Sequence, residues 1–211
     1  MPSDEPTLPD SRAEVLLRAG FSSSGEFDDE IGLGLTSLEP RDRVLALRAG
    51  LRRAIISLDQ WNSALSDSDV TVRRESLTML AYEELDFNDV ASLVIAALED
   101  DDALVVDGAI FALGEHLYAG AVERLSVIAT THDDARCRES AVAALGVIGD
   151  DRGREAVLAA LDDKPPVRRR AIVALSKFAG PDVDAALERA SEDRDWQVRA
   201  AVDQLTKDEP D

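Results

Sequence analysis

The sequence predicts an all-α protein, a right-handed α-solenoid of about five stacked helical hairpins with a helical cap at its N-terminal end. The first observation is a block of five residues, led by Val or Cys, that recurs with starts 33, 32, 30 and 31 positions apart. The second is a Leu eight residues after the start of each of the first four blocks. The blocks are residues 72–76, 105–109, 137–141, 167–171 and 198–202, and the leucines are Leu80, Leu113, Leu145 and Leu175.

A repeat of this length is typical of arrays in which each pair of helices packs only on its neighbours. The first, fifth and ninth residues of a block lie on one face of a helix, because helical neighbours are three or four residues apart. We therefore expect these apolar positions to form a continuous core. Aromatic residues make up only 4% of the chain, so this core must consist of Ala, Leu, Val and Ile.

The segment before the first block predicts two helices separated by a loop. Ser11 and Glu14 have the spacing of a capping box, so a short helix should begin there and end at Gly20. Residues 21–34 are rich in Ser, Asp and Gly and are expected to form a mobile loop. Apolar residues at three- and four-residue intervals then predict one long helix over 41–58, either a cap or a degenerate first repeat.

From Trp61 onward the chain is expected to form the helical hairpins. Each block belongs to the first helix of a pair, and the aspartates before it are suited to cap that helix. Second helices are expected over residues 88–98, 121–130, 154–161 and 183–190. The predicted organisation is a disordered N-terminus (1–10), an N-terminal helical cap (11–60), the repeat solenoid (61–207) and a frayed C-terminus (208–211).

The composition of the chain limits which classes of partner it can bind and in which cellular compartment we expect it. The net charge of -20 disfavours binding to phosphate polymers, so no nucleic acid is expected. No segment is long and apolar enough to cross a bilayer, and residues 1–6 lack the pattern of a signal peptide. Cys137 is the single cysteine and stands at the apolar first position of its block, which predicts a buried side chain. We therefore expect a cytoplasmic protein with no membrane contact.

Residues 167–175, Val-Arg-Arg-Arg-Ala-Ile-Val-Ala-Leu, are the cleanest copy of the repeated pattern. This pattern resembles the short HEAT-like repeats first described in bilin lyases, over about residues 61–207. The resemblance implies a solenoid in which an Arg at the second block position links successive repeats through Asp. The matching arginines are Arg73, Arg138, Arg168 and Arg199, and Val106 interrupts the series in the second block.

Three branches of this superfamily have functions that the residues can test. The iron-dependent hydroxylase carries His-Glu pairs at the third and fourth block positions, and no His stands there in this chain. Its two histidines, His116 and His132, have no ligand-like spacing, so no metal or cofactor is expected. The bilin lyases offer no catalytic motif that matches this sequence. The helical-repeat DNA glycosylases need a basic face, which the net charge opposes.

The sequence therefore favours a non-catalytic scaffold that binds a protein or peptide partner in a concave groove formed by the second helices. Two alternatives remain. One is an accessory protein for an enzyme that modifies a cofactor or chromophore, and the other is a structural subunit of a larger assembly.

Candidate partner-binding residues come from charge patterns. An Arg stripe in the N-terminal cap, an Arg pair in the fourth block and charged residues of the second helices could each dock a partner. Each could equally be a solvated helix face. The candidates are Arg41, Arg48, Arg52, Arg169, Arg170, Glu123, Arg124 and Glu155.

Overall fold

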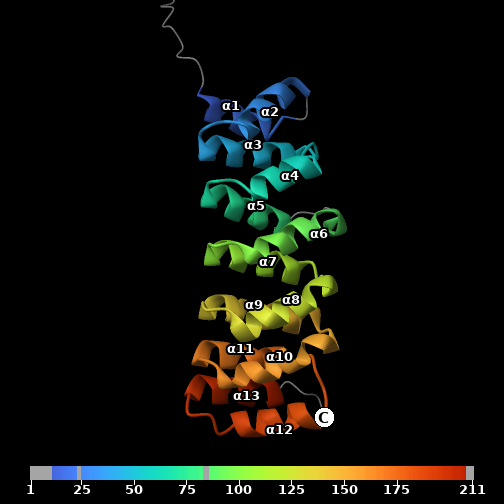
Figure 1. The fold of residues 1–211 in the computed structure, drawn as a ribbon, viewed down its shortest axis with the longest axis vertical. Helices are drawn as coiled ribbons and strands as arrows, with labels where there is room; N and C mark the ends of the chain where they lie inside the picture. Colours follow the sequence, from blue (N-terminus) through green and yellow to red (C-terminus); the bar gives the residue numbers. More distant parts are fainter. Residues whose placement is uncertain (1–10, 23–24, 83–85, 208–211) are drawn as a thin grey trace, which may run out of the picture. The chain divides into compact units, whose positions relative to one another are not determined.

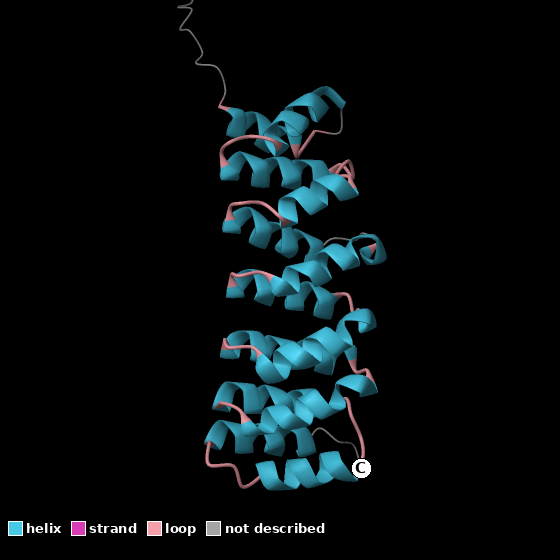
Figure 2. Cartoon of the chain, in the orientation of Figure 1, coloured by secondary structure: helices cyan, strands magenta, loops and turns pink. Residues whose placement is uncertain are grey.

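The computed structural model describes residues 11–22, 25–82 and 86–207, which are helical and contain no β-strand (Figure 2). Figure 1 labels the helices in chain order. Contacts divide the chain into two compact units, residues 1–79 and 80–211, and each is described by itself. The segments expected to be disordered or frayed, 1–10 and 208–211, lie outside the described residues.

The first unit contains four helices and most of a fifth. Ser11 and Glu14 form the capping box that the sequence predicts, with both reciprocal hydrogen bonds present. Leu16, Ile31 and Ala46 are buried together where the first three helices meet. The elements are α1 (Arg12–Ala19), a 3-10 turn (Gly25–Phe27), α2 (Asp28–Leu35), α3 (Pro40–Arg52), α4 (Leu58–Leu65) and α5 (Val70–Tyr82), whose last turn belongs to the second unit.

The prediction of a loop over residues 21–34 was wrong, because α2 occupies the second half of that segment. Its first turn holds three acids, which the positive end of the helix dipole stabilises. Gly34 faces the core, where a Cβ would stand only 2.8 Å from the Cβ of Ala46. The Asp residues that suggested a loop therefore lie in the first turn of a helix, and Gly34 permits close packing.

The prediction of one helix over 41–58 was wrong at its C-terminal end. The helix α3 stops at Arg52, and Ala54 adopts a left-handed conformation with φ of 53°. A new helix, α4, then begins behind the capping box of Ser57 and Gln60. Leu58, assigned to the apolar stripe, is consequently exposed. The segment is a helical hairpin of α3 and α4, which favours a first repeat over a simple cap.

The second unit is a run of helical hairpins, and its second helices lie close to their predicted ranges. The first helices α7, α9, α11 and α13 pack each on the next, and α8 packs on both α9 and α10. The helices are α6 (Phe87–Ala96), α7 (Ala103–Glu115), α8 (Val122–Thr131), α9 (Ala135–Ile148), α10 (Arg154–Ala159), α11 (Pro165–Leu175), α12 (Pro181–Ala190) and α13 (Trp196–Lys207). Short 3-10 turns at Ala97–Glu99, Ala119–Ala121, Asp151–Gly153 and Ala160–Asp162 flank the second helices.

The predicted core positions are buried in both units. The leading residues of all five blocks are fully buried, and so are the four leucines that follow eight residues later. Ser76 stands where other blocks have Ala or Val, and its hydroxyl donates to the Val72 carbonyl, 2.8 Å away. Cys137 is buried with its thiol donating to the Ala103 carbonyl, and burial raises the pKa of that thiol to about 11. The prediction of an all-α solenoid is therefore confirmed.

Small residues set the close approach of the first helices. A Cβ added to Gly146 of α9 would stand 2.6 Å from the Cβ and 2.7 Å from the Cα of Ala174 in α11. A Cβ at Gly114 of α7 would meet the Cβ of Ala144 in α9 at 3.3 Å. Because backbone atoms are involved at Gly146, a larger residue there has to push the two helices apart.

Replacing Gly146 by Ala should destabilise the second unit by about 1–3 kcal/mol, because overpacking outweighs the better helix propensity of Ala. The matched control is Gly32→Ala in α2, where no atom lies within 4 Å of the added Cβ. This control should stabilise the protein by up to about 1 kcal/mol. Urea denaturation followed by far-UV circular dichroism measures both changes. Stabilisation by Gly146→Ala would contradict the close approach of α9 and α11.

Candidate functional site

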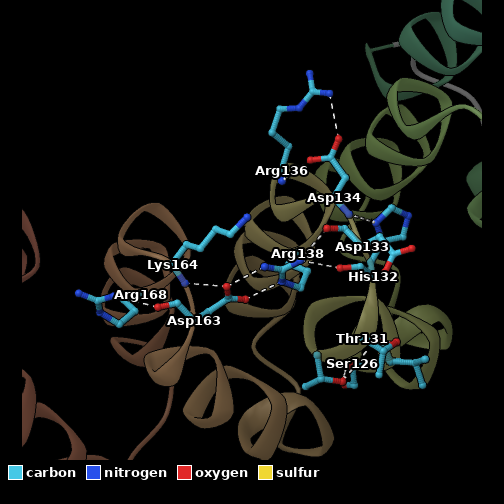
Figure 3. Close-up of polar contacts among 12 residues, drawn as sticks. Ser126, Thr131, His132, Asp133, Asp134, Arg136, Arg138, Asp163, Lys164 and Arg168 are labelled. Carbon is cyan, nitrogen blue, oxygen red and sulfur yellow. Dashed lines mark hydrogen bonds and ion pairs between the residues drawn. The ribbon is translucent and has the colours of Figure 1, made fainter.

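An arginine in each of several first helices connects its own repeat to the next. In the second unit, Arg138 of α9 makes a two-pronged ion pair with Asp163, with N–O distances of 2.6 and 2.7 Å (Figure 3). Its remaining nitrogen, Nη1, donates to the carbonyls of His132 and Asp133 in the loop before α9. One guanidinium thereby fixes two successive loops, and we call this arrangement the Arg–Asp clamp.

The same clamp recurs at α11 and confirms the link that the family resemblance implied. Arg168 pairs with Asp193 at 2.9 and 2.7 Å and donates to the carbonyl of Asp163. The side chains of Arg168 and Asp193 are only 5% and 15% exposed. Arg199 of α13 likewise donates to the Asp193 carbonyl. Bidentate geometry and partial burial make these pairs stronger than ordinary surface ion pairs.

The first unit contains a clamp that sequence reasoning missed. Arg43 of α3 pairs with Asp67 through two N–O distances of 2.6 Å and donates to the Ser37 carbonyl. The signal was present, since Arg43 stands 30 residues before Arg73 and has Ala46 three positions on, as in later blocks. It was obscured because Asp42 and Gly50 replace the expected Val and Leu. The family pattern therefore did not reveal Arg43 as a fifth matching arginine.

The clamp aspartates also organise the loops that they occupy. Asp67 accepts the backbone N–H of Asp69, and Asp193 accepts that of Asp195. In these two loops the second aspartate then caps the following first helix: Asp69 accepts the N–H of Thr71, and Asp195 accepts that of Gln197. Sequence reasoning predicted the caps, but the clamp role of the first aspartate came only from the resemblance.

One junction of the second unit has neither half of the clamp. Val106 of α7 is buried where the arginine would stand, and His132 occupies the place of the aspartate in the loop before α9. The Nδ1 atom of His132 accepts the N–H of Asp134 at 3.1 Å, which reproduces the loop hydrogen bond without a negative charge (Figure 3). Neither the arginine nor the aspartate of the clamp is therefore present at this junction.

The clamps shift the protonation of their acids. The guanidinium of Arg138 and the backbone N–H of Lys164 hold the pKa of Asp163 below its ordinary value. Arg168 and the N–H of Asp195 do the same to the pKa of Asp193. Both carboxylates therefore stay ionised at neutral pH. Their ion pairs with arginine are lost only when acid protonates the carboxylates.

A groove runs across the outer face of the first helices in the second unit, with a volume of about 340 Å³. We call the apolar part of its lining the floor; it includes Phe111 of α7 and Val147 of α9, which are 41% and 56% exposed. The ring of Tyr82 lies 5.6 Å from that of Phe111. The complete lining is Asp107, Ile110, Phe111, Gly114, Glu115, Glu139, Ser140, Ala143, Ala144, Val147 and Arg170.

We call the polar side chains of the same lining the rim of the groove. Ser140 donates to Asp107 across the α7–α9 junction at 2.5 Å. Arg170 of α11 lies 3.6 Å from Glu139 at the other side. An apolar floor with charged groups around it is the usual composition of a surface that binds a side chain of a partner.

Most of the sequence-predicted site residues are engaged within the chain. Arg48 pairs with Glu75, and Arg52 lies over the ring of Phe21 at 4.7 Å. Arg169 donates to Gln197, whereas Arg41 and Glu155 are exposed. Arg170 alone among the predicted residues lines the groove.

The two predicted residues of α8 belong to ion pairs on the second-helix side. Glu123 accepts from Arg152, and Arg124 pairs with Glu99. Arg154 lies 3.6 Å from Asp182, so this side holds a series of matched charges. The role of these residues in partner binding stays a prediction.

The histidines have structural contacts. His116 stacks on Phe87, and its Nε2 lies 2.7 Å from the Leu80 carbonyl. A second cavity, by the loop before α9, is lined by His132, Arg138 and Asp163, whose polar atoms already serve the clamp.

Across 11–22, 25–82 and 86–207, no group of three or more His, Cys, Asp or Glu side chains is placed to hold a metal. No helix in these ranges has the length and hydropathy of a membrane span.

The clamped hairpins and the groove along their first helices define the class of α-solenoid repeat proteins. The sequence profile of HEAT repeats matches residues 58–146 and 122–206, so the chain belongs to the HEAT-repeat family. No curated protein matches it significantly.

Solved structures support the fold at low sequence identity. An engineered protein is 20% identical with a TM-score of 0.63, over 87% of this chain and 98% of its own. YibA of E. coli is 18% identical with a TM-score of 0.61, over 94% of this chain and 75% of its own. A designed armadillo repeat protein in complex with the peptide (KR)4 is 15% identical with a TM-score of 0.57, over 94% and 99%.

Replacing Arg168 by Met should lower the free energy of unfolding by about 3–5 kcal/mol, because Asp193 is left largely buried without its counter-charge. Arg124→Met is the matched control, because its pair with Glu99 is exposed and should contribute less than about 1 kcal/mol. Urea titrations of both variants give the comparison. Equal losses would refute a special role for the clamp.

The clamp should also make the free energy of unfolding depend on pH. Because the folded pKa of Asp163 lies below the unfolded value of about 3.9, its contribution is complete at neutral pH. It is lost as pH falls through the folded pKa. The stability gap between wild type and Asp163→Asn should therefore be widest at pH 7 and narrow from about pH 5 to pH 3. Asp101→Asn, at an exposed site, should leave little gap at either pH.

Proposed function

We propose that this protein is a non-catalytic scaffold that binds a segment of a partner protein in the groove of α7, α9 and α11. The observation that carries the proposal is the groove itself. Phe111 and Val147 expose apolar surface in a hollow whose rim holds Asp107, Glu115 and Glu139. Exposed apolar surface of this kind, rimmed by polar groups, marks an interaction site.

The first helices are favoured over the second helices as the binding face. On the second-helix side, charged groups satisfy one another, as Arg152 does with Glu123 and Asp150. A partner would have to break these pairs before it could use the same groups. On the first-helix side, Phe111 and Val147 would gain free energy by leaving water, and a partner could cover them without breaking an ion pair of either side chain.

The comparisons are consistent with this function. HEAT repeats form a scaffold on which binding depends on surface side chains rather than on a catalytic motif. The designed armadillo protein of similar fold was solved with a peptide bound. A cytoplasmic location remains part of this proposal.

The experiment captures partners from a native lysate on immobilised protein at matched ionic strength, with mass spectrometry as the readout. Val147→Ser tests the groove, and Val127→Ser in α8 is the control with the same substitution at nearly equal exposure, 56% against 58%. A partner held by wild type and Val127→Ser should be lost from Val147→Ser. Loss from Val127→Ser alone, or equal capture by all three, would overturn the groove as the binding surface.

A further inference from the structure

We infer that the groove of α7, α9 and α11 binds an extended segment of a partner protein through an arginine side chain. This inference rests on the proposed function and specifies the chemistry of the occupant. Three features of the groove support this inference. They are its excess of negative charge, its exposed aromatic surface, and the presence of both in one groove.

The charge of the groove is negative and only partly compensated. Its lining holds three carboxylates and one guanidinium, and the guanidinium of Arg170 already lies beside Glu139. Asp107 accepts a hydrogen bond from Ser140, which leaves its charge in place. Within the part of the chain that the structure describes, the carboxylate of Glu115 has no hydrogen bond or ion pair. The carboxylates of the groove therefore outnumber its single guanidinium.

On the α7 side the sequence gives no further cation, whereas α9 carries Arg136 within electrostatic range of Asp107. Between Arg74 and Arg124 there are twelve acidic residues and no lysine or arginine. This interval includes all of α7, the helix that supplies Asp107, Phe111 and Glu115. A basic segment approaching this face would be attracted over a distance of roughly one Debye length, about 8 Å at physiological salt.

The floor of the groove selects among basic and apolar occupants. An arginine has an aliphatic stem that can lie on Val147 and a planar head that can stack on Phe111 or Tyr82. A purely apolar side chain would displace the water that hydrogen-bonds to the carboxylates, and it could not donate hydrogen bonds in place of that water. An acidic side chain would be repelled. Lysine is less suited than arginine, because its compact ammonium is more strongly hydrated and cannot stack.

The test uses three fluorescent decapeptides in which Ser alternates with Arg, with Leu or with Glu, and measures binding to the full chain by fluorescence anisotropy. The Arg peptide should bind about tenfold more tightly than the Leu peptide, and the Glu peptide should not bind. Phe111→Ala should weaken the Arg peptide about tenfold, and Glu115→Gln about fivefold. Circular dichroism establishes that both variants remain folded.

The control for general attraction to an acidic protein is Asp89→Asn, which removes the same charge from an exposed site on α6. It should change the affinity of the Arg peptide less than twofold, roughly the scale of a screened surface charge. Equal weakening by Asp89→Asn and Glu115→Gln would overturn the inference. Tighter binding of the Leu peptide, weakened by Phe111→Ala, would overturn the arginine occupant yet support the groove. If Phe111→Ala affects none of the peptides, the proposed function fails as well.

Discussion

The Arg–Asp clamp is the interaction on which the arrangement of the repeats depends. A guanidinium such as that of Arg138 donates to carbonyls of its own loop and to the carboxylate of the next loop. Because the two loops precede successive first helices, one side chain fixes where both helices begin. The close contact of Gly146 with Ala174 then fixes how near those helices lie. The core residues need only fill the space that these two constraints define.

The same constraints explain why the two sides of a hairpin differ. The clamp holds α9 beside α11, and the close approach of Gly114 to Ala144 holds α7 beside α9 without a clamp, so side chains at equivalent positions of these helices line one face. Where that face carries Phe111 and Val147, it becomes a groove with an apolar floor. On the second-helix side, Arg152 and Arg154 form ion pairs with nearby acids, so these charges already have partners within the chain. Binding specificity can therefore change on one side without altering the connections that maintain the fold.

Much of the fold could be predicted because its determinants are periodic. The leading Val and the later Leu of each block are buried wherever the pattern is intact, and the capping residues are local in sequence. Prediction failed where one residue type served two purposes. Gly34 indicated a loop but permits close packing, and Arg43, which lies among the arginines of the N-terminal segment, forms a clamp. The groove could not be predicted, because its floor uses outward positions that vary between repeats, such as Phe111 and Ala143.

The junction of Val106 and His132, which lacks both halves of the clamp, makes the repeats non-interchangeable, although their helices are alike. If the repeat of α7 preceded the Asp163 loop, that carboxylate would face a valine. If the repeat of α9 preceded the His132 loop, Arg138 would face an imidazole instead of an acid. Either shuffling would leave a partly buried charge without its partner, which is costly. The order of modules is therefore encoded in the contacts between them, and an exchange of one repeat requires an exchange of the loop that follows it.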